Sequence, residues 1–122
     1  MARVEVSQSI GPKVVTSLDE VNGGTKTSEE FPVETYTVHS YQVILESLGA
    51  GTDLVFKVLA TNDEKANYQT IAEYDIHGSA VGGGENTSGI MYSDIWNFKW
   101  AKCEISGTWA GTKVTVIEKH NP

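Results

Sequence analysis

Three histidines and one cysteine are the side chains in this sequence with the clearest capacity to bind a transition metal. His39, His77 and His120 lie far apart along the chain. A zinc site needs His, Cys or carboxylate ligands that converge, and such ligands usually come in closely spaced pairs. The histidines show no such spacing, so the sequence predicts no metal site and no cofactor.

The single cysteine lies in a run that alternates between apolar and charged residues. Ala101, Cys103 and Ile105 share one face of this run, and Lys102 and Glu104 share the other. A free cysteine on the apolar face of a strand is usually a small buried hydrophobe rather than a nucleophile. One cysteine cannot form a disulfide within the chain, so nothing in its cysteine usage indicates an oxidising compartment.

Other motifs of catalysis or ligand binding are incomplete. Asn62, Asp63 and Glu64 lack the alternating oxygen ligands and the glycine of an EF-hand loop, and they predict a turn. The glycines at 82–84 do not join a strand to a helix, so they do not predict a phosphate-binding loop. No Gly-x-Ser-x-Gly nucleophile elbow is present. We expect no catalytic residues and no enzyme activity.

The three tryptophans leave two interpretations open. Exposed aromatic rings beside glycine-rich loops could bind sugars by stacking, as a carbohydrate-binding module does. Alternatively, Trp96 and Trp100 pack in the core or at its rim, and Trp109 lies on a turn. Loss of glycan binding in Trp109→Ala would favour the first interpretation.

Length and charge narrow the class of protein. A chain of 122 residues fits one domain that can bury a core without disulfide or metal crosslinks. Its 16 acidic and 9 basic residues give a net charge of −7, which disfavours binding to nucleic acid. The N-terminal residues lack the apolar segment of a secretory signal, and no run of about 18 apolar residues predicts a membrane span.

Short apolar runs separated by turn residues indicate strands rather than helices. The clearest runs cover residues 41–47, 54–60, 73–77, 101–105 and 113–118. Glycines between the first two runs predict a hairpin, and the glycine-rich segment 78–89 predicts a flexible loop. Many short strands without a helix predict an all-β fold, an antiparallel β-sandwich that is jelly-roll-like.

The first thirty residues differ from the rest in being polar and interrupted. They predict an extended N-terminal arm or hairpin over residues 1–30, followed by a sandwich domain over residues 31–122. An extended arm leaves backbone N–H and C=O groups free to add to the sheet of a partner. The predicted partner contacts are Val4, Val6, Ile10, Val14, Val15 and Trp109. Deletion of residues 1–30 is then expected to leave a folded sandwich that assembles poorly.

The order of several motifs resembles that of small virion structural proteins of tailed bacteriophages. The matching segments are residues 40–45, 51–58, 60–63, 68–71, 98–103 and 111–116, so the resemblance covers roughly residues 40–118. A strand, a glycine turn, a second strand, a Ser-Asn-Asp turn and an aromatic residue are followed by an aromatic-basic strand and a glycine-led final strand. Here Thr61 replaces the usual Ser, Tyr68 the usual Trp and Lys102 the usual Arg, and the loop at 78–89 is distinctive.

This resemblance implies a role in assembly, with no catalytic residues to transfer. The implied function is that of a capsid decoration (cement) subunit, made in the host cytoplasm and located in the virion. The implied partners are the phage major capsid protein and further copies of this chain, with a trimer as the first expectation. A tail or baseplate accessory subunit and a carbohydrate-binding module are the alternatives.

Cys103 gives the first testable prediction. If its strand faces the core, Cys103→Ser should lower the free energy of unfolding by about 1–3 kcal/mol, because a buried hydroxyl needs a hydrogen-bond partner. Chemical denaturation measures this change. Rapid labelling of the native protein by a thiol reagent would contradict the burial.

Overall fold

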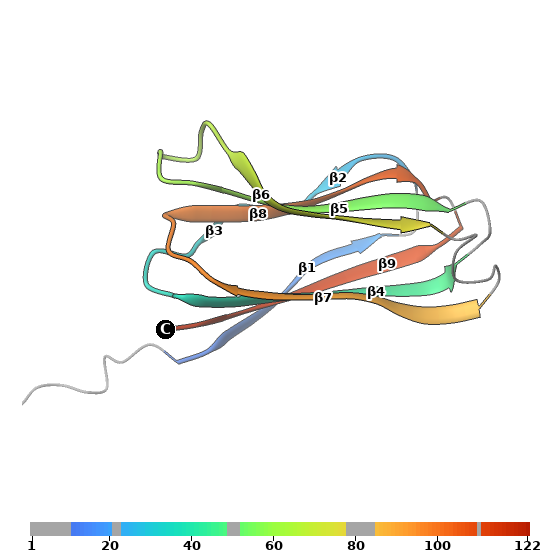
Figure 1. The fold of residues 1–122 in the computed structure, drawn as a ribbon, viewed down its shortest axis with the longest axis horizontal. Helices are drawn as coiled ribbons and strands as arrows, with labels where there is room; N and C mark the ends of the chain where they lie inside the picture. The colour runs from blue at the N-terminus through green and yellow to red at the C-terminus, as the bar shows by residue number, and fades with distance from the viewer. Residues whose placement is uncertain (1–10, 21–22, 49–51, 78–84, 110) are drawn as a thin grey trace, which may run out of the picture.

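The protein is a sandwich of two antiparallel β-sheets (Figure 1). The computed structural model describes residues 11–20, 23–48, 52–77, 85–109 and 111–122, with side chains described for all of these except 47, 48 and 85–89. No helix in this described part of the chain is long and apolar enough to cross a membrane.

Each sheet is built from strands that are distant in sequence. Sheet A has the order β1-β9-β4-β7, and sheet B has the order β2-β8-β5-β6, with β3 also paired to β8. The strands of sheet A are β1 (Lys13–Glu20), β9 (Lys113–Asn121), β4 (Val38–Leu48) and β7 (Glu85–Ile95). Those of sheet B are β2 (Lys26–Thr27), β3 (Phe31–Pro32), β8 (Trp100–Thr108), β5 (Asp53–Thr61) and β6 (Gln69–His77). Because β2 and β3 share one strand position beside β8, this order is that of a jelly roll, and the predicted fold class is confirmed.

The predicted hairpin between residues 41–47 and 54–60 is wrong. Both segments are strands, but β4 pairs with β7 and β9 in sheet A, whereas β5 pairs with β6 and β8 in sheet B. The connection between them therefore passes from one sheet to the other. Alternating residues and a glycine-containing connection are compatible both with a hairpin in one sheet and with a connection between two sheets. Only the pairing with strands distant in sequence distinguishes these two arrangements.

The boundary predicted at residue 31 is also wrong, because the sandwich begins before it. β1 pairs with β9 from Lys13↔His120 to Glu20↔Val114, and β2 pairs with β8. Leu18 on β1 lies in the core and is 7% exposed. β1 covers the edge of β9 that would otherwise be unpaired. Residues 1–10, which complete the predicted arm, lie outside the described residues.

The loop predicted over residues 78–89 is wrong in its second part. Residues 85–89 belong to β7, where Leu45↔Thr87 and Ile44↔Ser88 are cross-strand pairs with β4. The segment is polar and contains Gly89, so its own strand propensity is low. Pairing with a long neighbouring strand overrides that local preference.

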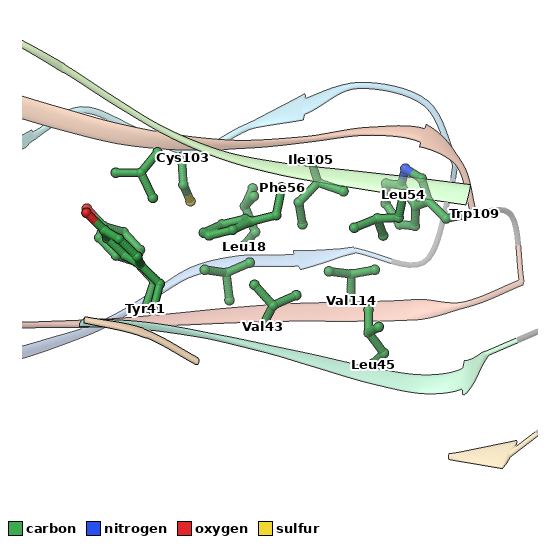
Figure 2. Packing of buried hydrophobic residues seen from close by; sticks show 13 residues of the cluster. Leu18, Tyr41, Val43, Leu45, Leu54, Phe56, Cys103, Ile105, Trp109 and Val114 are labelled. Carbon is green, nitrogen blue, oxygen red and sulfur yellow. The ribbon is translucent and has the colours of Figure 1, made fainter. Parts of the chain in front are cut away.

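The core lies between the sheets and is formed by their alternating inward residues (Figure 2). Tyr41 and Val43 from sheet A face Phe56 and Cys103 from sheet B. The predicted burial of Cys103 is confirmed, and burial raises the pKa of its thiol to about 12. Its sulfur lies 3.6 Å from the Ser17 hydroxyl, so the thiol is held as a packed side chain.

The place of β1 in the core can be tested with two substitutions on the same strand. Leu18→Ala should lower the free energy of unfolding by about 2–5 kcal/mol, because it leaves a cavity between the sheets. Val14→Ala is the control, because Val14 is 61% exposed and its loss should change stability by less than about 0.5 kcal/mol. Equal urea denaturation midpoints for the two variants would place β1 outside the core.

Candidate functional site

The outward side of sheet A carries the three most exposed of the large apolar side chains in the described part of the chain. Met91 and Ile95 on β7 are 72% and 74% exposed, and Val14 on β1 is 61% exposed. Strand alternation places three partly buried residues, Val38, Ile44 and Ile117, on the same side. Ile95 pairs with Val38, and Met91 and Ile117 flank Gln42. We call these six apolar residues and the polar residues between them the sheet A face.

The charged side chains described on the sheet A face balance one another. Its outward positions among the described residues hold two lysines, Lys113 and Lys119, and two carboxylates, Asp19 and Glu46. Lys113 lies 3.7 Å from Asp19 and is the cross-strand partner of Glu46, so three of these charges lie together at one end. The formal charge of these four described side chains sums to zero, whereas the whole chain carries −7.

The predicted contact residues fall into three groups. Val14 is exposed on the sheet A face, and Val15 is partly buried opposite Glu118. Val4, Val6 and Ile10 lie outside the described residues.

Trp109 is a core residue, so its prediction as a contact is wrong. The side chain is 1% exposed and packs with the main core cluster at one end of the sandwich (Figure 2). Its indole N–H donates a hydrogen bond to the carbonyl of Gly24 at 2.7 Å. The turn after β8 folds this ring inward, and turn composition alone does not show that direction.

The other two tryptophans pack at the opposite end of the molecule from Trp109. Trp96 stacks on His39 with ring centroids 3.5 Å apart, and its N–H donates to the hydroxyl of Tyr92. Trp100 is partly buried, and the ammonium of Lys65 lies 4.6 Å from its ring centroid. These contacts agree with the expectation of core and rim packing.

A polar groove lies beside Trp100 on sheet B. Its volume is about 390 Å³, and its lining includes Ser28, Glu29, Glu30, Lys65 and Lys102. The Lys102 ammonium covers the ring of Tyr68 at 4.2 Å, and the Tyr68 hydroxyl donates to Glu30 at 3.1 Å. Burial and the adjacent Glu30 raise the pKa of Tyr68. Since one lysine already covers a face of Tyr68 and another covers a face of Trp100, a sugar that stacks on either of these faces would first have to displace the lysine.

A chain of buried hydrogen bonds crosses the end of the core near Trp96. The Nε2 atom of His39 lies 2.8 Å from the carbonyl oxygen of Trp96, and its Nδ1 lies 2.8 Å from Nδ1 of His120. Nε2 of His120 lies 2.6 Å from Oε1 of Glu118. All three side chains are almost completely buried. We call this arrangement the His39–His120–Glu118 chain.

The hydrogen-bonding groups determine how many protons this chain holds. A carbonyl oxygen can only accept, so Nε2 of His39 donates to Trp96. The contact between the two Nδ1 atoms needs one proton, and the contact between His120 and Glu118 needs another. Three protons shared by two imidazoles and one carboxylate make the chain electrically neutral, which is the form that burial favours.

Aromatic rings surround the two histidines. Phe31 stacks on His120 at 4.8 Å, and Tyr41 meets the same ring edge-on at 5.8 Å. Burial lowers the pKa of His39, although its hydrogen bond to Trp96 acts in the opposite sense. The Tyr41 hydroxyl is buried and has no hydrogen-bond partner among the described residues.

The spacing of the histidines in the sequence predicted no contact between them, whereas the structure brings two of them together. His39 and His120 are a direct cross-strand pair of β4 and β9. One signal was available: Val114 and Val116 alternate with polar residues in the predicted strand 113–118, and Glu118 and His120 continue the same alternation. Among the described residues, no three His, Cys, Asp or Glu side chains converge as metal ligands.

Comparison with known proteins identifies the fold. No family model matches the sequence, and neither does any curated protein. A structure from the disulfide-linked pili that Bacillus endospore appendages form is similar over 99% of this chain and 97% of that chain, with 7% identity and a TM-score of 0.54. The SPBc2 prophage-derived protein YomS is similar over 97% of this chain and 100% of that chain, with 17% identity and the same TM-score.

A third similar structure is a cleaved adhesin domain of Lys-gingipain from Porphyromonas gingivalis. It matches 80% of this chain and 62% of that chain, with 10% identity and a TM-score of 0.52. At these identities the likeness shows the fold alone. The protein is a β-sandwich module.

Burial of Trp109 predicts that its substitution affects stability. Trp109→Ala should lower the free energy of unfolding by about 3–5 kcal/mol, because it removes a large core side chain and leaves the Gly24 carbonyl without its donor. Denaturant unfolding followed by circular dichroism measures the loss. Trp100→Ala is the matched control and should cost less, since that ring is only partly buried. A stable Trp109→Ala protein that has lost glycan binding would contradict the burial.

Proposed function

We propose that this protein is a structural subunit of a phage-type virion that acts by assembly, with capsid decoration as its specific role. Its partners would be the major capsid protein and further copies of itself. The proposal depends chiefly on one observation, the sheet A face, where exposed apolar side chains lie among described charges that sum to zero. The occurrence of this fold over the full length of a prophage-derived protein supports it at the level of architecture.

Apolar area supplies the free energy for association. Complete burial of a side chain such as Met91, Ile95 or Val14 contributes about 1.5–3 kcal/mol. These residues are more than half exposed in the single chain, so a partner that covers them gains most of that contribution. Clusters of exposed apolar residues on soluble domains commonly mark interaction sites.

Charge determines which surface a second copy can approach. Two molecules with a net charge of −7 repel each other, and the repulsion is weakest where the facing surfaces are neutral. The sheet A face meets that condition among the described residues. A closed homo-oligomer is the common outcome for such subunits, and a trimer would match the local three-fold symmetry of capsid joints.

The free edge of sheet A adjoins the same surface. Among the described residues β7 pairs only with β4, so within this part of the chain the other side of the strand has no neighbour in the sheet. Edge strands are usually protected by charged side chains, yet Met91, Ser93 and Ile95 project from β7 on the sheet A face. An interface centred on β7 would therefore cover apolar side chains and an unpaired strand edge together.

The association surface can be tested by adding one negative charge to either sheet. Met91→Glu should weaken self-association at least tenfold, because it places a carboxylate in the apolar interface. Thr70→Glu adds the same charge to an exposed position of β6 in sheet B, and it should leave association unchanged. Multi-angle light scattering over a concentration series measures the association. A wild-type protein that stays monomeric, or equal association of both variants, would contradict the proposed interface.

The location in the virion is tested by immunogold electron microscopy of particles produced by the genome that encodes this chain. Regular labelling of capsids supports decoration. Labelling confined to tails would replace the capsid role with that of a tail accessory subunit. Purified particles without the protein would contradict a virion role altogether.

A further inference from the structure

The His39–His120–Glu118 chain lies beneath two connecting segments that close one end of the sandwich. These are residues 31–37, which lead into β4, and residues 96–99, which join β7 to β8. The Trp96 carbonyl accepts from His39, and the ring of Phe31 stacks on His120. The histidine pair therefore contacts both segments.

The two segments are also bonded to each other. The Val33 amide donates to the Lys99 carbonyl at 3.0 Å, and the Trp96 amide donates to the Thr37 carbonyl at 3.0 Å. The side-chain amide of Asn97 donates to the carbonyls of Glu34 and Tyr36. Loss of the contact between His39 and His120 would therefore loosen the two segments together.

The contact between the histidines holds one proton and has no room for a second. Their Nδ1 atoms are 2.8 Å apart, the length of a single hydrogen bond. With Nε2 of His39 already donating to Trp96, a further proton on this ring must go to Nδ1. Two N–H groups would then point at each other inside the core, and the chain would gain a buried positive charge.

We propose that the His39–His120–Glu118 chain is an acid-sensitive contact, and that uptake of one further proton opens the end of the sandwich formed by residues 31–37 and 96–99. Opening exposes the small apolar cluster that these segments form with β5 and β8, in which Val33, Ala60 and Ala101 are buried and Phe31 and Phe98 pack against them. The inference does not depend on the proposed virion role.

The pH range in which the contact opens follows from the difference between the pKa of His39 in the folded and in the unfolded state. The pKa of His39 is lowered in the folded protein, whereas an unfolded histidine has a pKa of about 6.5. Below that pH the open or unfolded state binds more protons than the closed state, so stability is lost as the pH falls. For one proton, the opening equilibrium constant rises by up to about tenfold per pH unit.

Several other titratable groups face the histidines. They are Glu118 on β9, Tyr41 on β4, Tyr92 on β7, Cys103 on β8 and Tyr36 between β3 and β4. In addition, Asp94 is the cross-strand partner of His39, and Lys13 is that of His120. Burial raises the pKa of Tyr41, Tyr92 and Cys103. These three groups therefore keep their protons in the acid range and do not supply the transition.

Hydrogen exchange of named amides tests the inference on the full chain. The reporters are the amides of Val33, Thr37, Trp96 and Lys99, which are bonded across the closed end. After correction for the intrinsic rate, their exchange should rise by up to tenfold per pH unit from about pH 6.5 to 5. Amides in the centres of β5 and β8 should not follow the same dependence. Equal protection of the reporters over this range would overturn the inference.

Two histidine substitutions separate the buried contact from ordinary surface titration. His39→Gln should abolish the pH dependence of the reporter amides, because the glutamine cannot take up the additional proton. His77→Gln is the control, since His77 is exposed and pairs with Asp53 at 2.8 Å elsewhere on the surface. An unchanged pH dependence in His39→Gln, or its loss in His77→Gln, would overturn the assignment.

A measurement on the wild-type protein covers the case in which His39→Gln fails to fold. Imidazole ¹⁵N spectra should show a protonated Nε2 for His39, and only one protonated Nδ1 between His39 and His120, while the reporter amides are protected. Protonation of both Nδ1 atoms with undiminished protection would overturn the inference. A change in these spectra or in protection on treatment with a chelator would do so as well, because it would make the histidines metal ligands.

Discussion

The antiparallel pairing of β4 with β9 is the interaction on which the rest of the structure depends. These strands occupy the centre of sheet A, and their register runs from Val38↔Asn121 to Glu46↔Lys113. This register directs Tyr41 and Val43 inward together with Val116 and Glu118. A shift by one residue would turn the apolar residues outward and separate the two histidines. Core packing and the buried hydrogen bonds are therefore set by one pairing.

The buried polar chain is compatible with this core because its groups satisfy one another. An isolated carboxylate or imidazolium between the sheets would be strongly destabilising, whereas a neutral set with three short hydrogen bonds avoids an unpaired charge. A buried polar set of this kind also selects its own arrangement, since a wrong register of β4 and β9 would leave His120 without His39. The same requirement makes the end of the sandwich sensitive to the number of protons.

The outer surfaces of the two sheets differ in character. On sheet B, Lys57 lies between Glu73 and Glu104 as a cross-strand partner of both, and lysines cover Tyr68 and Trp100. On sheet A, apolar side chains reach the surface, and three of the four described charges lie together at one end. Charged side chains keep a sheet soluble and discourage association. This difference is the reason that the proposed interface lies on sheet A.

The amino-acid sequence by itself determined that the four most regular segments are strands and which of their residues face inward. Alternation in residues 41–47, 54–60, 101–105 and 113–118 is a local property, so it predicted the fold class and the burial of Cys103. Tertiary structure alone decided which strands pair. It separated β4 from β5, brought β1 into sheet A, turned Trp109 inward and placed His39 opposite His120. Pairing depends on residues far apart in the chain that become neighbours only when both sheets form together, and no local pattern records that proximity.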